Sequence, residues 1–188
     1  MHLDRNGWLQ PNCSIQLAPS PNKNARPIDC EPYLLVIHNI SLPPNQFHGP
    51  AVVHFFQNQL DFDAHPWFEN IRGVTVSAHF FIRRDGHLVQ FVSTDERAWH
   101  AGISSFNGRA SCNDFSIGIE LEGADTIPYT EAQYQSLSAL TQLLAQRYPI
   151  QAIRGHEHIA PGRKTDPGPS FDWWHYATQS GLPLRFFP

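Results

Sequence analysis

The sequence predicts an α/β domain in which strands alternate with helices, and three observations support this fold class. The run Tyr33–His38 is short and apolar throughout, which is typical of a strand covered on both faces. Two further apolar runs, residues 79–84 and 87–92, flank an Asp-Gly dipeptide that favours a tight hairpin turn. Leucines at helical spacing follow Thr130. With 188 residues, the chain fits a single domain over residues 1–188.

Two segments around the first strand have weaker patterns. Residues 12–31 contain several prolines and two cysteines, and we interpret them as an irregular arm laid over the body. Residues 39–75 form a long segment interrupted by Pro43 and Pro44. A helix is expected within residues 50–59 and a helical turn at 68–72, and the weak pattern predicts that the whole segment is mobile.

The run 115–121 alternates in the manner of a strand. Ser116, Gly118 and Glu120 lie on one face, and the apolar residues between them lie on the other. Glu120 is therefore expected to point away from the apolar face.

The clearest helix begins at Thr130, which forms a capping box with Gln133. Apolar side chains continue at helical spacing until Pro149 ends the run; they are Leu137, Leu140, Leu144 and Tyr148. A brief strand is then expected at residues 152–156, followed by a loop over 157–169 that is rich in glycine and proline.

Composition limits the partners and the compartment. Thirteen Lys and Arg against 17 Asp and Glu give a net charge of −4, which argues against nucleic acid or an anionic membrane as the main partner. No apolar run is long enough for a membrane span, and the first residues lack the apolar core of a secretory signal. The three cysteines form no C-x-x-C pair, which fits a reducing compartment. We therefore expect a cytoplasmic protein.

The 11 histidines raise the prospect of a metal or proton-transfer site. His38, His156 and Asp166 lie where strands or loops end, and two histidines with a carboxylate suit a catalytic zinc that keeps a fourth position for water. Spacing alone leaves simpler explanations open, because His38 could bond to backbone groups and Asp166 could start an Asp-Pro turn. Residues 155–158, Gly-His-Glu-His, match neither the metalloprotease nor the deaminase zinc signature.

Six blocks of sequence carry a resemblance to a known family: residues 38–44, 76–79, 82–86, 97–102, 112–123 and 163–169. In this order they resemble the AmpD-type anhydro-muramyl-peptide amidases, and the resemblance extends over about residues 7–174. It implies a central mixed β-sheet flanked by helices, as in peptidoglycan-recognition proteins and the amidase lysozymes of phages. It also implies a cytoplasmic enzyme of murein recycling, a process linked to β-lactamase induction.

The resemblance assigns roles to five residues. It implies one zinc ion held by His38, His156 and Asp166, with Glu120 as proton acceptor and Lys164 stabilising the transition state. The bond cut would be the amide between N-acetylmuramic acid, in its 1,6-anhydro form, and L-alanine of the stem peptide. The side chains suit this chemistry, because amide hydrolysis needs an activated water, a base and a positive charge near the carbonyl oxygen.

Other residues are open to more than one interpretation. Glu122 lies on the same strand face as Glu120 and is the rival base. We expect substrate contacts from four residues, although Trp99 could instead be a core residue. The four are Asn39, Trp99, His100 and Arg109. His79 and His100 could instead donate to a metal ligand, or be structural residues that bond to backbone or water.

The chain departs from the family pattern at several positions. Thr75 and Ser111 replace arginines placed for the carboxylates of diaminopimelate, and Arg72 and Arg109 are the nearest substitutes. His158 stands where the pattern has an aspartate and could compete for metal. The apolar tail, residues 182–188, either folds back onto the body or meets a partner.

We expect a monomeric amidase that acts on anhydro-muramyl-peptides and binds neither nucleic acid nor membrane. Two alternatives share the same groove. One is a non-catalytic module that binds peptidoglycan fragments, and the other is a periplasmic amidase acting on intact murein.

Overall fold

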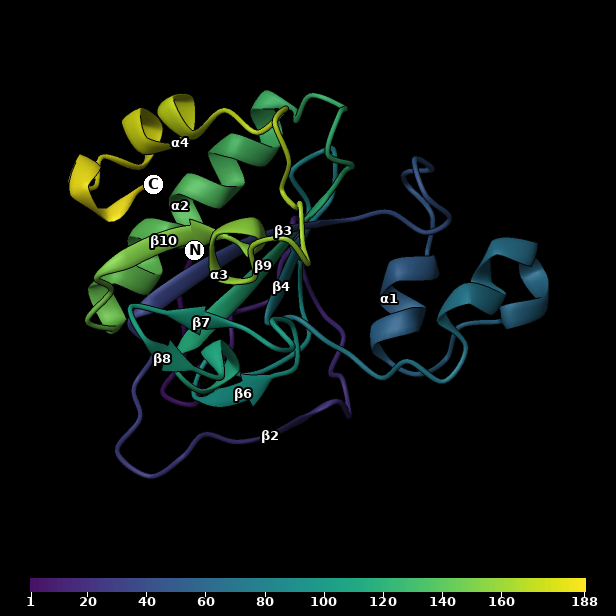
Figure 1. Cartoon of the computed structure of the whole chain (residues 1–188), viewed down its shortest axis with the longest axis horizontal. Helices are drawn as coiled ribbons and strands as arrows, with labels where there is room; N and C mark the ends of the chain where they lie inside the picture. Colours follow the sequence, from purple (N-terminus) through teal and green to yellow (C-terminus); the bar gives the residue numbers. More distant parts are fainter.

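The computed structural model describes residues 1–188 and is built on a six-stranded β-sheet (Figure 1). Across the sheet the strands are β1 (Ile15–Leu17), β5 (Leu88–Gln90), β4 (Phe80–Ile82), β9 (Ser116–Glu122), β3 (Leu34–Ile40) and β10 (Ala152–Gly155). All neighbours are parallel except β4 and β5. The sheet is therefore mixed, and the predicted α/β fold class is confirmed.

The antiparallel pair β4 and β5 is the hairpin predicted from the Asp-Gly dipeptide. Its turn is closed by a hydrogen bond from the Arg83 N–H to the His87 carbonyl oxygen at 2.9 Å. Gly86 has a φ of +83°, a left-handed conformation that glycine adopts without steric cost. The strands are shorter than the apolar runs, because the ladder ends where the turn begins.

The arm, residues 12–31, is more regular than predicted. Its β1 adds an edge strand to the main sheet, and β2 (Lys23–Ala25) pairs with β6 (Glu96–Ala98) in a separate two-stranded sheet. A third small sheet joins β7 (Ser105–Phe106) and β8 (Arg109–Ala110). The strands β1 and β2 were not predicted because three residues are too short to show a periodicity, and because their partners β5 and β6 lie far along the chain.

The two central strands, β3 and β9, place the chemistry. Residues Leu34–Ile37 of β3 are fully buried, as expected for a strand covered on both faces. The strand continues two residues beyond His38, so this histidine lies inside β3 rather than at its end. The parallel register sets His38 opposite Glu120. Because side chains alternate along a strand, both project from the same face of the sheet.

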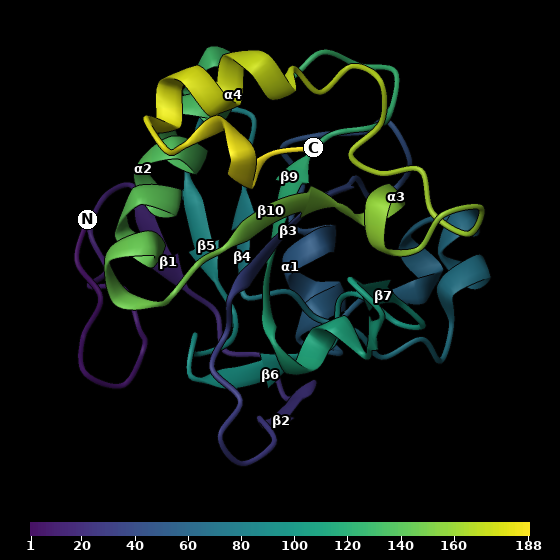
Figure 2. The same cartoon turned by 60° about the vertical axis from the view of Figure 1, so that its left-hand side comes forward.

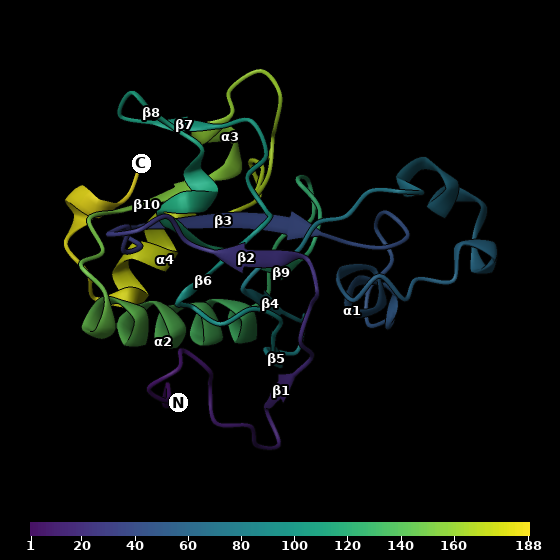
Figure 3. The ribbon, with the colours of Figure 1, turned by 90° about the horizontal axis from the view of Figure 1, so that it is seen from below.

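The other face of the sheet is covered by α2 (Glu131–Arg147) and α4 (Trp173–Ser180), as Figure 3 shows from below. The predicted capping box is present, since the Thr130 Oγ1 accepts a hydrogen bond from the Gln133 N–H at 3.1 Å and the Gln133 Oε1 accepts one from the Thr130 N–H at 3.1 Å. The apolar stripe of α2 packs on the apolar face of β9; the side chains involved include Leu137, Leu140, Leu144, Ile117, Ile119 and Leu121.

The segment 39–75 extends beyond the carboxyl end of β3 (Figures 1 and 3). It contains α1 (Ala51–Phe56) and 3₁₀ turns at Phe62–Ala64 and Pro66–Ile71, so the expected helix is present but shorter. Phe56 is anchored against Phe91 of the body, with ring centroids 5.1 Å apart. The mobility of this segment remains a prediction.

The chain after β10 begins with one helical turn, α3 (His156–Ile159), where a loop was predicted. The C-terminal tail returns to lie over β10 (Figure 2), with Phe187 buried and the Arg154 guanidinium donating to the Phe186 carbonyl oxygen at 2.7 Å. A further 3₁₀ turn lies at Leu184–Phe186 and another at Cys112–Asp114. None of the helices has both the length and the apolar character that crossing a membrane requires.

Candidate active site

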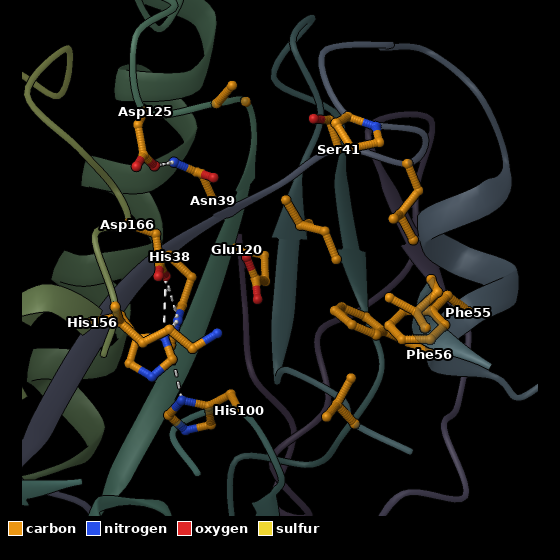
Figure 4. Close-up of a pocket in the computed structure, with 18 of the residues that line it drawn as sticks. His38, Asn39, Ser41, Phe55, Phe56, His100, Glu120, Asp125, His156 and Asp166 are labelled. Carbon is orange, nitrogen blue, oxygen red and sulfur yellow. Dashed lines mark hydrogen bonds and ion pairs between the residues drawn. The ribbon is translucent and has the colours of Figure 1, made fainter. Parts of the chain in front are cut away.

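Three side chains predicted as metal ligands converge at the carboxyl end of the central strands (Figure 4). The His38 Nδ1 lies 3.0 Å from the Asp166 Oδ2, and the His156 Nδ1 lies 3.1 Å from the same oxygen. The two Nδ1 atoms are 3.0 Å apart. Both imidazoles are buried and the carboxylate is mostly buried, so the three donor atoms form a small, largely buried triangle.

The parallel pairing of β3 with β10 explains how residues so distant in sequence meet. Gly155 pairs with Ile37, so the residue after each, His156 and His38, reaches the same edge of the sheet. A hydrogen bond from the Glu157 N–H to the Asp166 carbonyl oxygen at 3.0 Å then ties the following loop to α3. A Cβ at Gly155 would come within 2.7 Å of a proline ring in this loop, so glycine permits the close approach.

Each imidazole of the cluster has a partner on its outer nitrogen. The His156 Nε2–H donates to the Ala101 carbonyl oxygen at 3.0 Å, so a neutral His156 presents a lone pair at Nδ1. The Arg163 guanidinium donates to the same carbonyl at 2.7 Å. The His38 Nε2 lies 2.9 Å from the His100 Nδ1. Such outer contacts orient metal ligands in known sites.

Burial shifts the pKa values of these groups. Burial lowers the pKa of His38 to about 4, although its bond to Asp166 acts in the opposite direction. Burial also lowers the pKa values of His79 and His100 well below 6.5. Burial alone would raise the pKa of Asp166, but the adjacent imidazoles of His156 and His38 hold it well below its usual value. The cluster therefore combines an anionic carboxylate with an uncharged His38.

These shifts predict that the metal-free protein is less stable in mild acid. The three histidines His38, His79 and His100 stay neutral when folded, but each binds a proton below about pH 6.5 when unfolded. Their contribution to stability is therefore complete above pH 6.5 and is lost as the pH falls toward 4. Glu120 and Glu157, whose pKa values are raised, act in the opposite direction, but they are two groups against four, because the pKa of His158 is lowered as well.

We therefore expect the free energy of unfolding of chelator-treated protein to decrease by about 1.4 kcal/mol per pH unit for each net proton taken up. Urea titrations at about pH 7, 6 and 5 measure this decrease. An unfolding free energy that stays constant across this range would contradict the expectation.

Glu120 is a buried carboxylate with an unused oxygen. The residue is 8% exposed, and its Oε2 is buried without a hydrogen-bond partner. Burial raises the pKa of Glu120 well above 4.5, and the nearby charge of Asp166 raises it further. Figure 4 shows the carboxylate projecting into the pocket beside His38.

Glu122, the rival base, is placed differently. Its Oε1 accepts a hydrogen bond from the His48 N–H at 2.6 Å, and its Oε2 accepts one from the Arg84 N–H at 3.0 Å. Both oxygens are therefore occupied by backbone donors, and Glu122 holds the segment after β3 against the hairpin turn.

The cluster and Glu120 open into a cavity of about 480 Å³. Lys164 and Asn39 line it on the side of the cluster, and the Asn39 amide donates to the Asp125 carboxylate at 2.8 Å. The opposite wall comes from the segment 39–75 and is apolar; it includes Phe55, Phe56, Trp67 and Ile71. This wall could not be predicted from the sequence, because nothing in the pattern of that segment indicates which side chains face the site.

Four other residues singled out in the sequence lie away from the cavity. The Trp99 indole N–H donates to the Asn24 Oδ1 at 2.8 Å, and neither Trp99 nor Arg109 lines the pocket. The Arg109 guanidinium lies over the Phe115 ring, 4.3 Å from its centroid. Arg72 pairs with a glutamate of its own turn. His158 accepts a hydrogen bond from the Gly155 N–H at 2.9 Å and does not join the metal cluster.

Comparisons with known proteins identify the family of this chain. Residues 29–169 match the family described as N-acetylmuramoyl-L-alanine amidase. The chain is 57% identical over 175 residues to the 1,6-anhydro-N-acetylmuramyl-L-alanine amidase AmpD of Citrobacter freundii. The aligned residues make up 92% of this chain and 91% of that protein.

Solved structures similar to this chain include the following two. A crystal structure of a Se-Met AmpD derivative gives a TM-score of 0.91 at 55% identity, covering 95% of this chain and 99% of that one. The amidase AmiD of Escherichia coli, in complex with the substrate anhydro-N-acetylmuramic acid-L-Ala-D-gamma-Glu-L-Lys, gives a TM-score of 0.56 at 28% identity, covering 94% of this chain and 65% of that one.

Proposed function

The chain belongs to the N-acetylmuramoyl-L-alanine amidase family, and we propose that it hydrolyses the amide bond between 1,6-anhydro-N-acetylmuramic acid and L-alanine of the stem peptide. One observation carries the proposal: a triangle of metal-ligand atoms and an unpartnered carboxylate, Glu120, open into the same cavity. We further propose that the protein acts as a monomer in the cytoplasm, on soluble fragments of the cell wall, without binding membrane.

The donor set supports one zinc ion per chain, held by His38, His156 and Asp166. Two imidazole nitrogens and a carboxylate oxygen are the donors that catalytic zinc sites use, and tetrahedral zinc would space them about 3.3 Å apart. The separations of 3.0 to 3.1 Å are close to this value. When bound, zinc would acidify a water molecule and polarise the scissile carbonyl.

Glu120 is suited to move the proton in this reaction. Glu120 lines the cavity and its Oε2 has no hydrogen-bond partner, so the carboxylate is free to accept a proton from the attacking water. Its raised pKa brings it closer to the working pH, which favours a group that must both take a proton and release it to the leaving nitrogen. Its position opposite His38 in the sheet fixes the carboxylate next to the ligand cluster.

Lys164 is suited to balance negative charge on the carbonyl oxygen. It lines the cavity and lies two residues before Asp166 in the sequence. Its positive charge is one of the smaller influences on the pKa values of His38 and Glu120 and lowers both, so its electric field reaches the site. A fixed positive charge near a developing oxyanion stabilises the transition state.

The proposal predicts a zinc-dependent amidase. Purified protein is expected to release free stem peptide from anhydro-muramyl-peptide, to lose this activity after chelation, and to regain it with about one equivalent of zinc. Mass spectrometry of the products and metal analysis of the protein measure this. Zinc-loaded protein that binds the fragment but leaves it intact would indicate a binding module, and faster cleavage of whole sacculi than of soluble fragments would contradict the cytoplasmic assignment.

A further inference from the structure

Behind His38, on the side away from Asp166, two polar side chains are buried next to each other. The His38 Nε2 lies 2.9 Å from the His100 Nδ1, and the His100 Nε2 lies 3.2 Å from the Ser116 Oγ. The Ser116 Oγ is in turn 2.6 Å from the Cys112 carbonyl oxygen. His100 is 9% exposed and Ser116 is fully buried, so this row of contacts is shielded from water.

The last contact fixes the direction of the others. A carbonyl oxygen only accepts, so the single Ser116 hydroxyl proton is donated to Cys112, and the Ser116 Oγ must accept from the His100 Nε2–H. No carboxylate contacts His100, which is therefore a neutral imidazole with its only N–H at Nε2. Its Nδ1 is then an acceptor, and the proton shared with His38 belongs to the His38 Nε2.

Strand β9 supports this row of contacts. Ser116, Gly118 and Glu120 lie on one face of the strand, at every second position. Ser116 bonds to His100, Gly118 lies under its ring, and Glu120 is the carboxylate of the site. The His100 ring lies against Gly118, where a Cβ would come within 2.4 Å of its Cγ. Glycine is thus needed at this position for the imidazole to reach both His38 and Ser116.

We propose that His100 and Ser116 are positioning residues that hold His38 in its Nε2–H tautomer, with the Nδ1 lone pair directed at the metal centre. The inference rests on the proposed zinc site. It also distinguishes the two histidine ligands, because His156 donates directly to a backbone carbonyl, whereas His38 depends on two side chains. A neutral His38 with the other tautomer would present an N–H to the metal.

Two substitutions of equal size test the role of His100. His100→Leu removes the acceptor, whereas His100→Asn keeps a carbonyl oxygen near the original Nδ1. We expect His100→Leu to weaken zinc binding about 10- to 100-fold, as is typical when an outer partner of a ligand is lost, and His100→Asn to recover much of this loss. Competition with a chromophoric chelator measures the affinity. Equal zinc affinity in the two variants, whether low or unchanged, would overturn the proposal.

The tautomers themselves are measured by ¹⁵N NMR of the ring nitrogens in zinc-loaded protein. We expect Nε2–H forms of both His38 and His100, and a mixture of His100 tautomers in Ser116→Ala. Thr141→Val is the matched control, since it removes a buried hydroxyl bonded to Tyr176 between α2 and α4. A His100 that carries its proton at Nδ1 in the wild type overturns the proposal. Because no substrate is present, this result is independent of whether the amidase assignment is correct.

Discussion

Replacing Glu120 by glutamine is expected to lower kcat by about 10²- to 10⁴-fold, the usual contribution of a general base, while zinc remains bound. Glutamine has nearly the shape of glutamate but accepts no proton at this position. The Oε2 of Glu120 has no hydrogen-bond partner, so the substitution breaks no structural contact of that atom. Turnover of anhydro-muramyl-peptide, measured together with the zinc content of the same sample, checks this expectation.

The same substitution at Glu122 is the matched control. Both oxygens of Glu122 accept hydrogen bonds from backbone N–H groups, and an amide NH₂ would face one of these donors. Glu122→Gln is therefore expected to reduce the free energy of unfolding by about 1–3 kcal/mol, the cost of leaving a buried donor unpaired, and to retain most of kcat. If Glu120→Gln kept its activity and Glu122→Gln lost it, the assignment of the base would be reversed.

The elements that were predicted correctly carry their signal within a few residues. The capping box of Thr130 and Gln133 fixes the start of α2, and the Asp-Gly turn fixes the hairpin. The alternation along β9 predicted that Glu120 lies on the face opposite the apolar residues, and the apolar side chains of that strand do pack under α2. These patterns depend on local backbone geometry, which a short stretch of sequence determines.

Contacts between distant segments were harder to predict. The strands β1 and β2 lie in an arm expected to be irregular, because each depends on a partner strand far along the chain. Residue types alone left His38, His156 and Asp166 as one of many possible triples, and their grouping came from the resemblance. The physical reason for their meeting is the parallel register of β3 with β10, which only the folded chain displays.

Outer contacts of the site were the least predictable. His100 was expected to contact substrate, to donate to a metal ligand or to be structural, and the structure places it both in the wall of the cavity and against His38. The contacts that run from His38 through His100 to Ser116 depend on which atom donates and which accepts. The spacing of residues in the sequence does not indicate the direction of a hydrogen bond. A glycine on the polar face of a strand, Gly118, was the one available signal, since it often marks close approach of another group.

Asp166→Asn is expected to remove most of the zinc affinity, by more than the roughly 100-fold that loss of an outer partner can cost. The carboxylate is the single anionic donor of the cluster, and both imidazoles contact its Oδ2. An amide of the same shape provides no negative charge to offset that of the cation in this largely buried place. Isothermal titration with zinc into chelator-treated protein measures the affinity, and amidase activity should fall with metal occupancy.

Asp125→Asn is the matched control, because Asp125 also lines the cavity but accepts from Asn39 and lies outside the cluster. We expect Asp125→Asn to bind zinc with the affinity of the wild type. If Asp166→Asn also bound zinc with wild-type affinity, Asp166 would be excluded as a ligand. Excess zinc separates the two kinds of defect. It should restore part of the activity of Asp166→Asn, whose deficit is in binding, and none of that of Glu120→Gln, whose zinc is already in place and whose missing function is proton transfer.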